Sequence, residues 1–365
     1  MSGTTLRQVL AARRGVRVGH ITSSFEFAPG WLFYLPVALQ WFVLGLRYGS
    51  FSLPTAANPA IVTGGLCGES KSAILELAGA AARPWIAPYV TLAAGAREPA
   101  AALRAIEAAG IAWPVVVKPD LGCNGTGVRL AADAAALAAM LPLYPAEAAL
   151  VVQELVPDEG EAGVFYMRRP GEARGRITSI TLKLAPHVTG DGRSTLRELV
   201  LADERAGRVP HLYLPRLAAR LGEVPPAGAR VRLVFSGNHC KGSIFRNGTA
   251  EVTPAMTARF DAIARDIRQF HFGRFDVRFA SLAELRRGEG FRIIEVNGVG
   301  SEATHIWDPD TTLREAYAAQ FFHYGAAFRI GSDMRRLGHR PSSLVEMRRL
   351  WRQQKRLMAA YPMND

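Results

Sequence analysis

Cysteine is scarce in this chain, and no two cysteines lie close together in the sequence. The 365 residues contain three, Cys67, Cys123 and Cys240, without a Cys-x-x-Cys pair. This spacing argues against a disulfide framework and against a cysteine-based zinc site. The first thirty residues also lack a compact apolar run ending in a small-residue cleavage site, so we expect no signal peptide. Both observations favour a cytoplasmic protein.

Excess charge is missing from most of the chain, although the net charge is +12. The first 60 residues carry five arginines and one glutamate, and residues 329–365 carry nine basic and three acidic side chains. The remaining central segment therefore contributes only +2. A broad basic groove is not expected there, so nucleic acid is not an expected partner. The basic ends point instead to an anionic membrane surface as a candidate partner.

A long apolar run is also lacking, and residues 31–46 come nearest to one. Gln40 is the single polar side chain in these sixteen residues, whereas a spanning helix needs about 20 apolar residues. Three alternatives remain: a buried helix pair broken at Pro36, a segment in the membrane interface, and a full span. Aromatic rings favour interfacial depth, and the full span is the weakest alternative.

From about residue 70, helix-like and strand-like segments alternate irregularly, which indicates an α+β fold. A chain of this length fits two or three domains. Strands are predicted at 113–120, 149–156, 163–169, 177–185, 273–280 and 290–297. Helices are predicted at 100–109, 132–140, 194–206, 253–270 and 311–328, with Ser194 and Thr253 as caps. Residues 207–230 are predicted to be a connection.

A lysine followed by a glycine-rich loop is the first pattern that suggests chemistry. Lys118 ends a predicted strand, and Gly122, Gly125 and Gly127 follow it. Glycines let backbone N–H groups approach phosphate oxygens, and an ammonium group neutralises their charge. The spacing is not that of a Walker A loop. A glycine-rich hairpin turn explains the same residues equally well.

The second pattern places oxygen ligands on two neighbouring predicted strands. Glu295 and Asn297 are two residues apart, so they project from one face of a strand, and Asp276 lies on the preceding strand. Carboxylate and amide oxygens suit Mg²⁺. A solvent-facing acidic rim is the alternative, but isoleucine and valine flank Glu295, as in a buried strand.

These patterns together resemble the ATP-grasp superfamily, and within it the carboxylate–amine ligases such as D-alanine–D-alanine ligase. The resemblance covers about residues 75–330. It implies an α+β fold in which two subdomains, 75–150 and 151–330, clasp ATP. Residues 1–74 would be an atypical N-terminal segment with an apolar helix, and residues 331–365 a basic amphipathic tail.

The resemblance also implies a nucleotide site and a metal site. The implied cofactors are ATP and Mg²⁺, with two ions and with Mn²⁺ as a substitute. The implied nucleotide-binding residues are Lys118, Gly122, Gly125, Thr126, Gly127, Gln153, Glu154, Leu155, Val156, Glu161 and Asn238. The implied metal ligands are Asp276, Glu295 and Asn297. Gln153 departs from the acid that the family has at the hinge, although Glu154 is adjacent.

Four residues would act in catalysis on the same resemblance: Arg274, Lys183, Arg193 and Ser301. Arg193 belongs to residues 189–195, which resemble a loop of cyanophycin synthetase and its relatives. Such a turn before a helix offers backbone donors and a cation to an anion. His239 is interpreted as a polar loop residue, because one histidine without a partner is weak support for a base.

Two further segments have alternative interpretations. Residues 64–71 form either an anion-binding turn, with Ser70 capping a helix beside Lys71, or a plain glycine-rich loop. Residues 343–360 form either an amphipathic helix on an anionic surface or a terminal helix packed on the body, which is slightly favoured.

The predicted function is ATP-dependent joining of a carboxylate and an amine through an acyl phosphate, of the acid–amino-acid ligase type. Its partners would be small-molecule carboxylate and amine substrates, one of them membrane-associated, and a homo-oligomer is an open alternative. The expected location is cytoplasmic, with peripheral contact at the inner face of the membrane. The alternatives are an ATP-grasp small-molecule kinase and a membrane- or nucleic-acid-binding protein that uses the basic ends.

Overall fold

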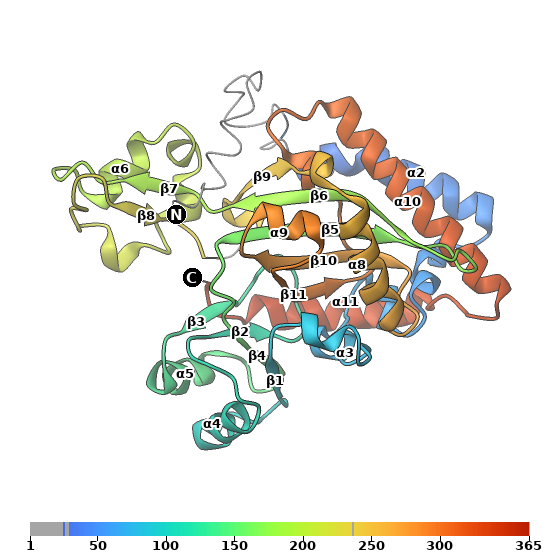
Figure 1. Ribbon diagram of the computed structural model, residues 1–365, viewed down its shortest axis with the longest axis horizontal. Helices are drawn as coiled ribbons and strands as arrows, with labels where there is room; N and C mark the ends of the chain where they lie inside the picture. Colours follow the sequence, from blue (N-terminus) through green and yellow to red (C-terminus); the bar gives the residue numbers. More distant parts are fainter. Residues whose placement is uncertain (1–24, 26–28, 236, 365) are drawn as a thin grey trace.

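A computed structural model describes Phe25 and residues 29–235 and 237–364 of the chain (Figure 1). Within these residues, two antiparallel sheets are joined in one α+β body. The smaller sheet has the order β1-β4-β2-β3, from β1 (Tyr89–Leu92), β2 (Val115–Pro119), β3 (Arg129–Ala131) and β4 (Leu150–Glu154). Helices α4 (Pro99–Ala108) and α5 (Ala134–Met140) lie beside it. The apolar runs of β2 and β4 are buried, as continuous valine segments predict.

The larger sheet has five strands in the order β11-β10-β5-β6-β9. They are β5 (Gly160–Met167), β6 (Arg176–Leu184), β9 (Ile244–Asn247), β10 (Phe272–Phe279) and β11 (Phe291–Asn297). Helices α8 (Pro254–Asp266), α9 (Leu282–Arg287) and α3 (Lys71–Leu75) pack beside it, and Phe260 and Phe275 belong to the largest apolar core. The predicted α+β fold is therefore confirmed.

Most predicted elements are present, and the differences lie at their ends. Helix α8 ends at Asp266 rather than at residue 270, because Ile267 already has extended backbone angles. Helix α10 (Leu313–Arg336) begins with a capping box at Thr312 and runs eight residues further than predicted. Element ends depend on local packing and are the least predictable part of a helix.

A third, smaller unit was not expected from the sequence. Strands β7 (His187–Thr189) and β8 (Arg230–Arg232) pair, and α6 (Leu196–Ala202) and α7 (Pro210–Tyr213) cover them. Their apolar side chains form a separate core. The prediction that residues 207–230 are only a connection is therefore wrong. The predicted helix 194–206 is also shorter, because Thr195 rather than Ser194 is its cap and Asp203 is extended.

Helix α2 (Gly30–Tyr48) is continuous, so the prediction of a buried helix pair broken at Pro36 is wrong. It lies along α10 (Figure 1) and buries only Phe33, Val37 and Gly45. Its other face is exposed, with Trp31 72% and Leu39 63% accessible. No helix in the described part of the chain is long and apolar enough to span a membrane. The full-span alternative therefore has no support among those residues.

Helix α11 (Leu344–Ala359) begins at the cap Ser343 and packs on the body, as the favoured alternative for this segment predicts. Its Leu357, and Tyr361 just after it, enter the apolar core of the smaller sheet. The helix runs below the larger sheet and reaches the smaller one (Figure 1). The C-terminal helix therefore packs on the smaller sheet and runs beside the larger one.

Candidate functional site

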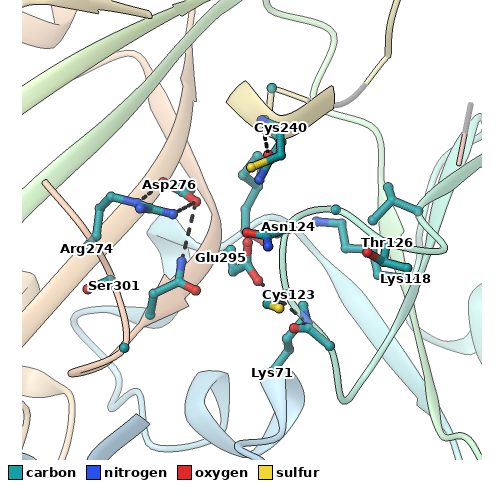
Figure 2. A pocket seen from close by; sticks show the side chains of 18 of the residues that line it. Lys71, Lys118, Cys123, Asn124, Thr126, Cys240, Arg274, Asp276, Glu295 and Ser301 are labelled. Atoms are coloured by element: carbon teal, nitrogen blue, oxygen red, sulfur yellow. Dashed lines mark hydrogen bonds and ion pairs between the residues drawn. The ribbon is translucent and has the colours of Figure 1, made fainter. Parts of the chain in front are cut away.

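One large cavity, of about 890 Å³, lies where the two sheets meet. Both sheets line it, together with residues 66–71, the turn around η7 (His239–Lys241), the loop after β11 and helix α11. Almost all the predicted site residues are found here, although they come from segments spread over some 180 residues of sequence. Figure 2 shows ten of the lining residues by name.

Lys118 stands at the end of β2 and points into this cavity (Figure 2). Its Nζ donates to Gln153 Oε1 at 2.6 Å and to the carbonyl oxygen of Ile294 at 3.2 Å. Burial lowers the pKa of Lys118 to about 8. Gln153, on the neighbouring strand β4, therefore accepts a hydrogen bond from the ammonium group of Lys118. The sequence predicted only that Gln153 lies at the hinge.

The glycine-rich loop borders the same cavity through Gly122, Gly125 and Thr126. Its three glycines have positive φ, 154° at Gly122, 65° at Gly125 and 73° at Gly127, where a side chain would be strained. Gly127 does not line the cavity; a Cβ there would lie 2.8 Å from Pro119 Cγ, so this glycine permits close packing. Phosphate binding by the other loop residues stays a prediction.

The hinge segment after β4 contributes Glu154, Leu155 and Val156 to the lining, as the resemblance implies for an adenine site. Glu154 Oε2 accepts from the backbone N–H of Ala112 at 3.1 Å. The segment therefore forms one edge of the cavity, next to Lys118.

Strands β5, β6 and β10 present a network of buried charges on the opposite side. Arg274 donates from Nε to Asp276 Oδ1 at 2.8 Å and from Nη2 to Asp276 Oδ2 at 3.0 Å. Lys183 Nζ lies 3.2 Å from Asp276 Oδ1 and 3.2 Å from Glu161 Oε1. Burial by itself would raise the pKa of Asp276, but Arg274 and Lys183 hold it below the ordinary value. These buried charges are therefore paired with other side chains of the protein.

The pairing of β10 with β5 explains why this network fits. Asp276 stands opposite Gly163, and a Cβ at Gly163 would lie 2.9 Å from Arg274 Cδ. Alternate residues of a strand share a face, so Arg274, Asp276 and Arg278 project together. The glycine leaves the room that the arginine side chain needs to fold back onto the carboxylate.

The predicted metal ligands meet at the edge of this network. Glu295 is directly opposite Asp276 in the β10–β11 pairing, and Asn297 Nδ2 lies 3.4 Å from Asp276 Oδ2. Glu295 Oε1 is 3.7 Å from Lys71 Nζ, and its side chain is 28% accessible. Two carboxylates and an amide from adjacent strands fit a hard cation such as Mg²⁺ by donor type. Glu295 is the more accessible of the two carboxylates, since Asp276 already contacts two cationic side chains.

No cluster of three or more histidine, cysteine, aspartate or glutamate side chains with metal-ligand geometry occurs among the described residues. The set just described has two carboxylates and takes its third ligand from an amide. Metal binding here therefore stays a prediction.

Glu161 and Asn238, predicted to bind nucleotide, both line the cavity but have protein partners. Glu161 pairs with Lys183 and lies 3.9 Å from Arg278 Nη2. Asn238 Oδ1 accepts from the backbone N–H of Cys240 at 2.9 Å and so caps a short turn. His239, in that turn, stacks on Trp307 with ring centroids 5.0 Å apart.

Ser301 and Gly300 line the cavity in the loop after β11. Ser301 Oγ donates to the Gly298 carbonyl oxygen at 2.5 Å. A Cβ at Gly65 would lie 2.6 Å from Gly298 Cα, so the segment around Gly65 packs directly onto this loop. The N-terminal segment is thereby part of the site.

Arg193 is the one predicted site side chain that the structure places elsewhere. It lies between β7 and α6 in the third unit and does not line the cavity. Asp191 Oδ1 accepts from the backbone N–H groups of Arg193 and Ser194, at 2.8 and 2.7 Å. These bonds, those from Ser194 first, lower the pKa of Asp191 to about 2. The backbone N–H groups of this loop are thus bonded to the loop's own aspartate.

Some lining residues were missed by the sequence analysis. Helix α11 contributes Trp351, Gln354, Lys355 and Met358. The amphipathic pattern of this segment predicted a helix, but nothing in the spacing indicated that it reaches a site formed by strands. Glu69 and Lys71 also line the cavity; both fall within residues 64–71, whose pattern fitted an anion-binding turn or a plain loop, but neither was named as a site residue.

Comparison with known proteins gives likenesses of fold only. No protein-family model matches the chain, and no curated protein matches it. Among solved structures, the chain is similar to a D-alanine–D-alanine ligase from Bacillus anthracis, with 13% identity, a TM-score of 0.40, and coverage of 75% of this chain and 68% of that one.

Two further solved structures are also similar to this chain. The VanG D-Ala:D-Ser ligase from Enterococcus faecalis has 14% identity, a TM-score of 0.41, and coverage of 73% and 64%. A bifunctional glutathione synthetase from Pasteurella multocida has 15% identity, a TM-score of 0.34, and coverage of 71% of this chain but 38% of that one.

Proposed function

We propose that this protein is an ATP-dependent carboxylate–amine ligase of the ATP-grasp type. One observation carries the proposal: Lys118 and the glycine-rich loop on one sheet face Asp276 and Glu295 on the other across a single cavity. A polyphosphate needs cations and backbone donors on one side and, through Mg²⁺, carboxylates on the other. The cavity also has the volume of a small-molecule site.

The nucleotide would lie between the hinge segment and the glycine-rich loop. Lys118 would contact the phosphates, because its ammonium group stays protonated near neutral pH with a pKa of about 8. Glu295, Asp276 and Asn297 would hold Mg²⁺, which neutralises charge on a transferring phosphoryl group when it is bound. Lys183 would keep Asp276 ionised and oriented from the neighbouring strand.

Arg274 would act on the acyl group. Attack of a carboxylate oxygen on the γ-phosphate gives an acyl phosphate and ADP, and the amine then displaces phosphate through a tetrahedral intermediate. Asp276 holds the guanidinium group by two hydrogen bonds, and Nη1 donates to the Glu302 carbonyl oxygen at 3.0 Å. A guanidinium fixed in this way can stabilise the oxyanion with its remaining N–H donors at no cost of reorganisation.

The test of this function is product analysis. The purified protein is incubated with ATP, Mg²⁺ and a panel of amino acids and small carboxylic acids, and ADP release and product masses are measured. The expected result is substrate-dependent ADP release together with an amide product. A phosphorylated small molecule without an amide would favour the kinase alternative, and no ADP release with any mixture would contradict both.

Contact with a membrane is a separate proposal, which the exposed face of α2 supports. Beside Trp31 and Leu39, the side chains of Leu35, Phe42 and Leu46 are each more than half exposed along that helix. Apolar and aromatic side chains of this kind, near basic residues such as Arg47, suit the interface of an anionic bilayer. A membrane-associated substrate would then reach the cavity from the lipid surface.

Flotation with liposomes tests this proposal directly. The intact protein should float with vesicles that contain anionic lipid, and a variant with Leu35→Glu and Leu39→Glu should not. If the intact protein and the double variant both stay in the soluble fraction, the α2 face does not bind membranes under these conditions and the proposal fails.

A further inference from the structure

The C-terminal segment contacts the glycine-rich loop, although it lies beyond the residues that the ATP-grasp resemblance covers. Tyr361 follows α11, and its OH donates to the carbonyl oxygen of Leu121 at 2.7 Å, directly before Gly122. Tyr361 is 9% accessible and belongs to the core of the smaller sheet. It does not itself line the cavity. Any effect of Tyr361 on a bound molecule therefore passes through the loop that it contacts.

Two glycines of the loop pack against the Tyr361 side chain. A Cβ at Gly127 would lie 3.0 Å from Tyr361 Cβ, and a Cβ at Gly122 would lie 3.5 Å from Tyr361 Cε2. Met358, in the last turn of α11, adds a contact, because its Sδ lies 3.8 Å from Cys123 Sγ. The C-terminal segment therefore packs against both ends of the loop, where the glycines leave room for it.

Two further side chains hold carbonyl oxygens of the same loop. Lys71 Nζ donates to the carbonyl oxygen of Gly122 at 2.6 Å, and Tyr144 OH donates to that of Gly127 at 2.7 Å. The rings of Tyr144 and Tyr361 have centroids 6.5 Å apart. Donors from α3, from the segment before β4 and from the C-terminal segment thus fix the two ends of the loop, and the tip of the loop lies between them.

We propose that Tyr361 is a positioning residue for the nucleotide, because it holds the glycine-rich loop in the form that binds phosphate. Glycines lose more backbone freedom than other residues when a loop is ordered around a ligand. Contacts that order the loop beforehand remove part of this cost from binding. The proposal rests on the proposed nucleotide-dependent function, and it gives the C-terminal segment a role in that function.

Calorimetric titration of ATP with Mg²⁺, without a carboxylate or amine substrate, tests this role. Tyr361→Phe keeps the ring in the core and removes only the donor to Leu121. ATP affinity should fall about three- to tenfold, as expected for the loss of one hydrogen bond. In turnover, the KM for ATP should rise by the same factor while kcat stays within about twofold, because the lost binding is common to the ground state and the transition state.

Tyr166→Phe is the matched control. Tyr166 is a buried tyrosine of β5 in the core of the larger sheet, and its OH donates to Asp261 Oδ1 at 2.7 Å. It does not line the cavity. This substitution should lower the melting temperature at least as much as Tyr361→Phe does and leave ATP affinity unchanged. Equal losses of ATP affinity in the two variants would show a general effect of stability and overturn the positioning role.

Hydrogen exchange of the backbone amides of residues 121–127 measures the order of the loop directly. Without ligand, these amides should exchange about three- to tenfold faster in Tyr361→Phe than in wild type, and at the wild-type rate in Tyr166→Phe. If Tyr361→Phe binds ATP as tightly as wild type or leaves the exchange unchanged, the positioning role is wrong and the ligase proposal stands. If ATP does not bind to the wild-type protein, the proposed function fails and the positioning role fails with it.

Discussion

The two walls of the cavity differ in how their charges are held. On the strand wall, formed by β5, β6, β10 and β11, Arg274 and Lys183 each form an ion pair with Asp276. On the helix wall, which consists of residues 66–71 and one face of α11, Glu69 Oε2 accepts no hydrogen bond from the described residues and Lys355 is exposed. A network whose charges are held by pairing between protein side chains suits a fixed role in chemistry, because little reorganisation is needed.

The largest expected effect is on the strand wall. Glu295→Gln removes the accessible carboxylate of the predicted metal site, and we expect ADP release to fall by about 100-fold or more, since the metal neutralises transferring phosphate charge. Steady-state ADP release at saturating Mg²⁺ measures it. The melting temperature should stay close to that of wild type.

The control for this substitution is Glu289→Gln, an exposed acid just before β11 that pairs with Arg287. It should leave turnover unchanged. Normal turnover by Glu295→Gln would remove the metal assignment and, with it, the catalytic role proposed for the strand wall.

The second prediction concerns the stability of the helix wall. Leu357 on α11 is 2% accessible within the core of the smaller sheet. Leu357→Ala should lower the free energy of unfolding by about 2–4 kcal/mol, through lost burial and a residual cavity. Urea denaturation measures the change.

Val345→Ala on the same helix is the control, because Val345 is 80% exposed. It should change the free energy of unfolding by less than about 0.5 kcal/mol. Equal effects of the two substitutions would show that α11 does not pack on the body as described, and the helix wall would lose its basis.

The third prediction concerns the pKa of Lys118, which stands on β2 of the smaller sheet and belongs to neither wall. Burial lowers this pKa to about 8, so the lysine is charged at pH 7 and mostly neutral at pH 9. ATP affinity should therefore fall as the pH rises through 8, by up to about tenfold between pH 7 and 9. Calorimetric titration of ATP at several pH values measures this loss.

Lys118→Arg should flatten the profile, since arginine stays charged throughout this range. A profile that falls equally in the variant would place the titrating group elsewhere. Bound phosphate charge raises the lysine pKa, which would move the decline toward higher pH but not reverse its direction.

The smallest effect is expected outside both walls. Arg193, which the sequence resemblance places in catalysis, lies in the third unit and not in the cavity lining. Arg193→Ala should change kcat/KM for ADP release by less than about twofold, within the small effect usual for surface positions. A loss of tenfold or more would show that the third unit closes over the cavity during turnover.

The strand wall was predictable because its functional residues lie close together in the sequence. Glu295 and Asn297 are two residues apart on one strand, and hydrophobic neighbours mark that strand as buried. Lys118 and its glycines likewise share one short segment. The spacing of such residues along the chain already shows which side chains share a face or a turn, without any long-range contact.

The helix wall had no comparable signal. Gly68 and Gln354 are 286 residues apart, and their hydrogen bond depends on α11 running below the larger sheet to the smaller one. The pattern of α11 predicts an amphipathic helix but not the surface on which it packs. The third unit was missed for a similar reason, since β7 and β8 are three residues each and pair across about forty residues.

The sequence by itself determined the α+β class, most helices and strands, and the charged and glycine-rich motifs. It did so because backbone geometry turns a spacing of two or of three to four residues into a shared face. Tertiary structure alone decided that Asp276 is paired with Lys183, that Arg193 stays outside the cavity, and that the C-terminal helix completes it. Those outcomes depend on contacts between segments far apart in the chain, which no local pattern encodes.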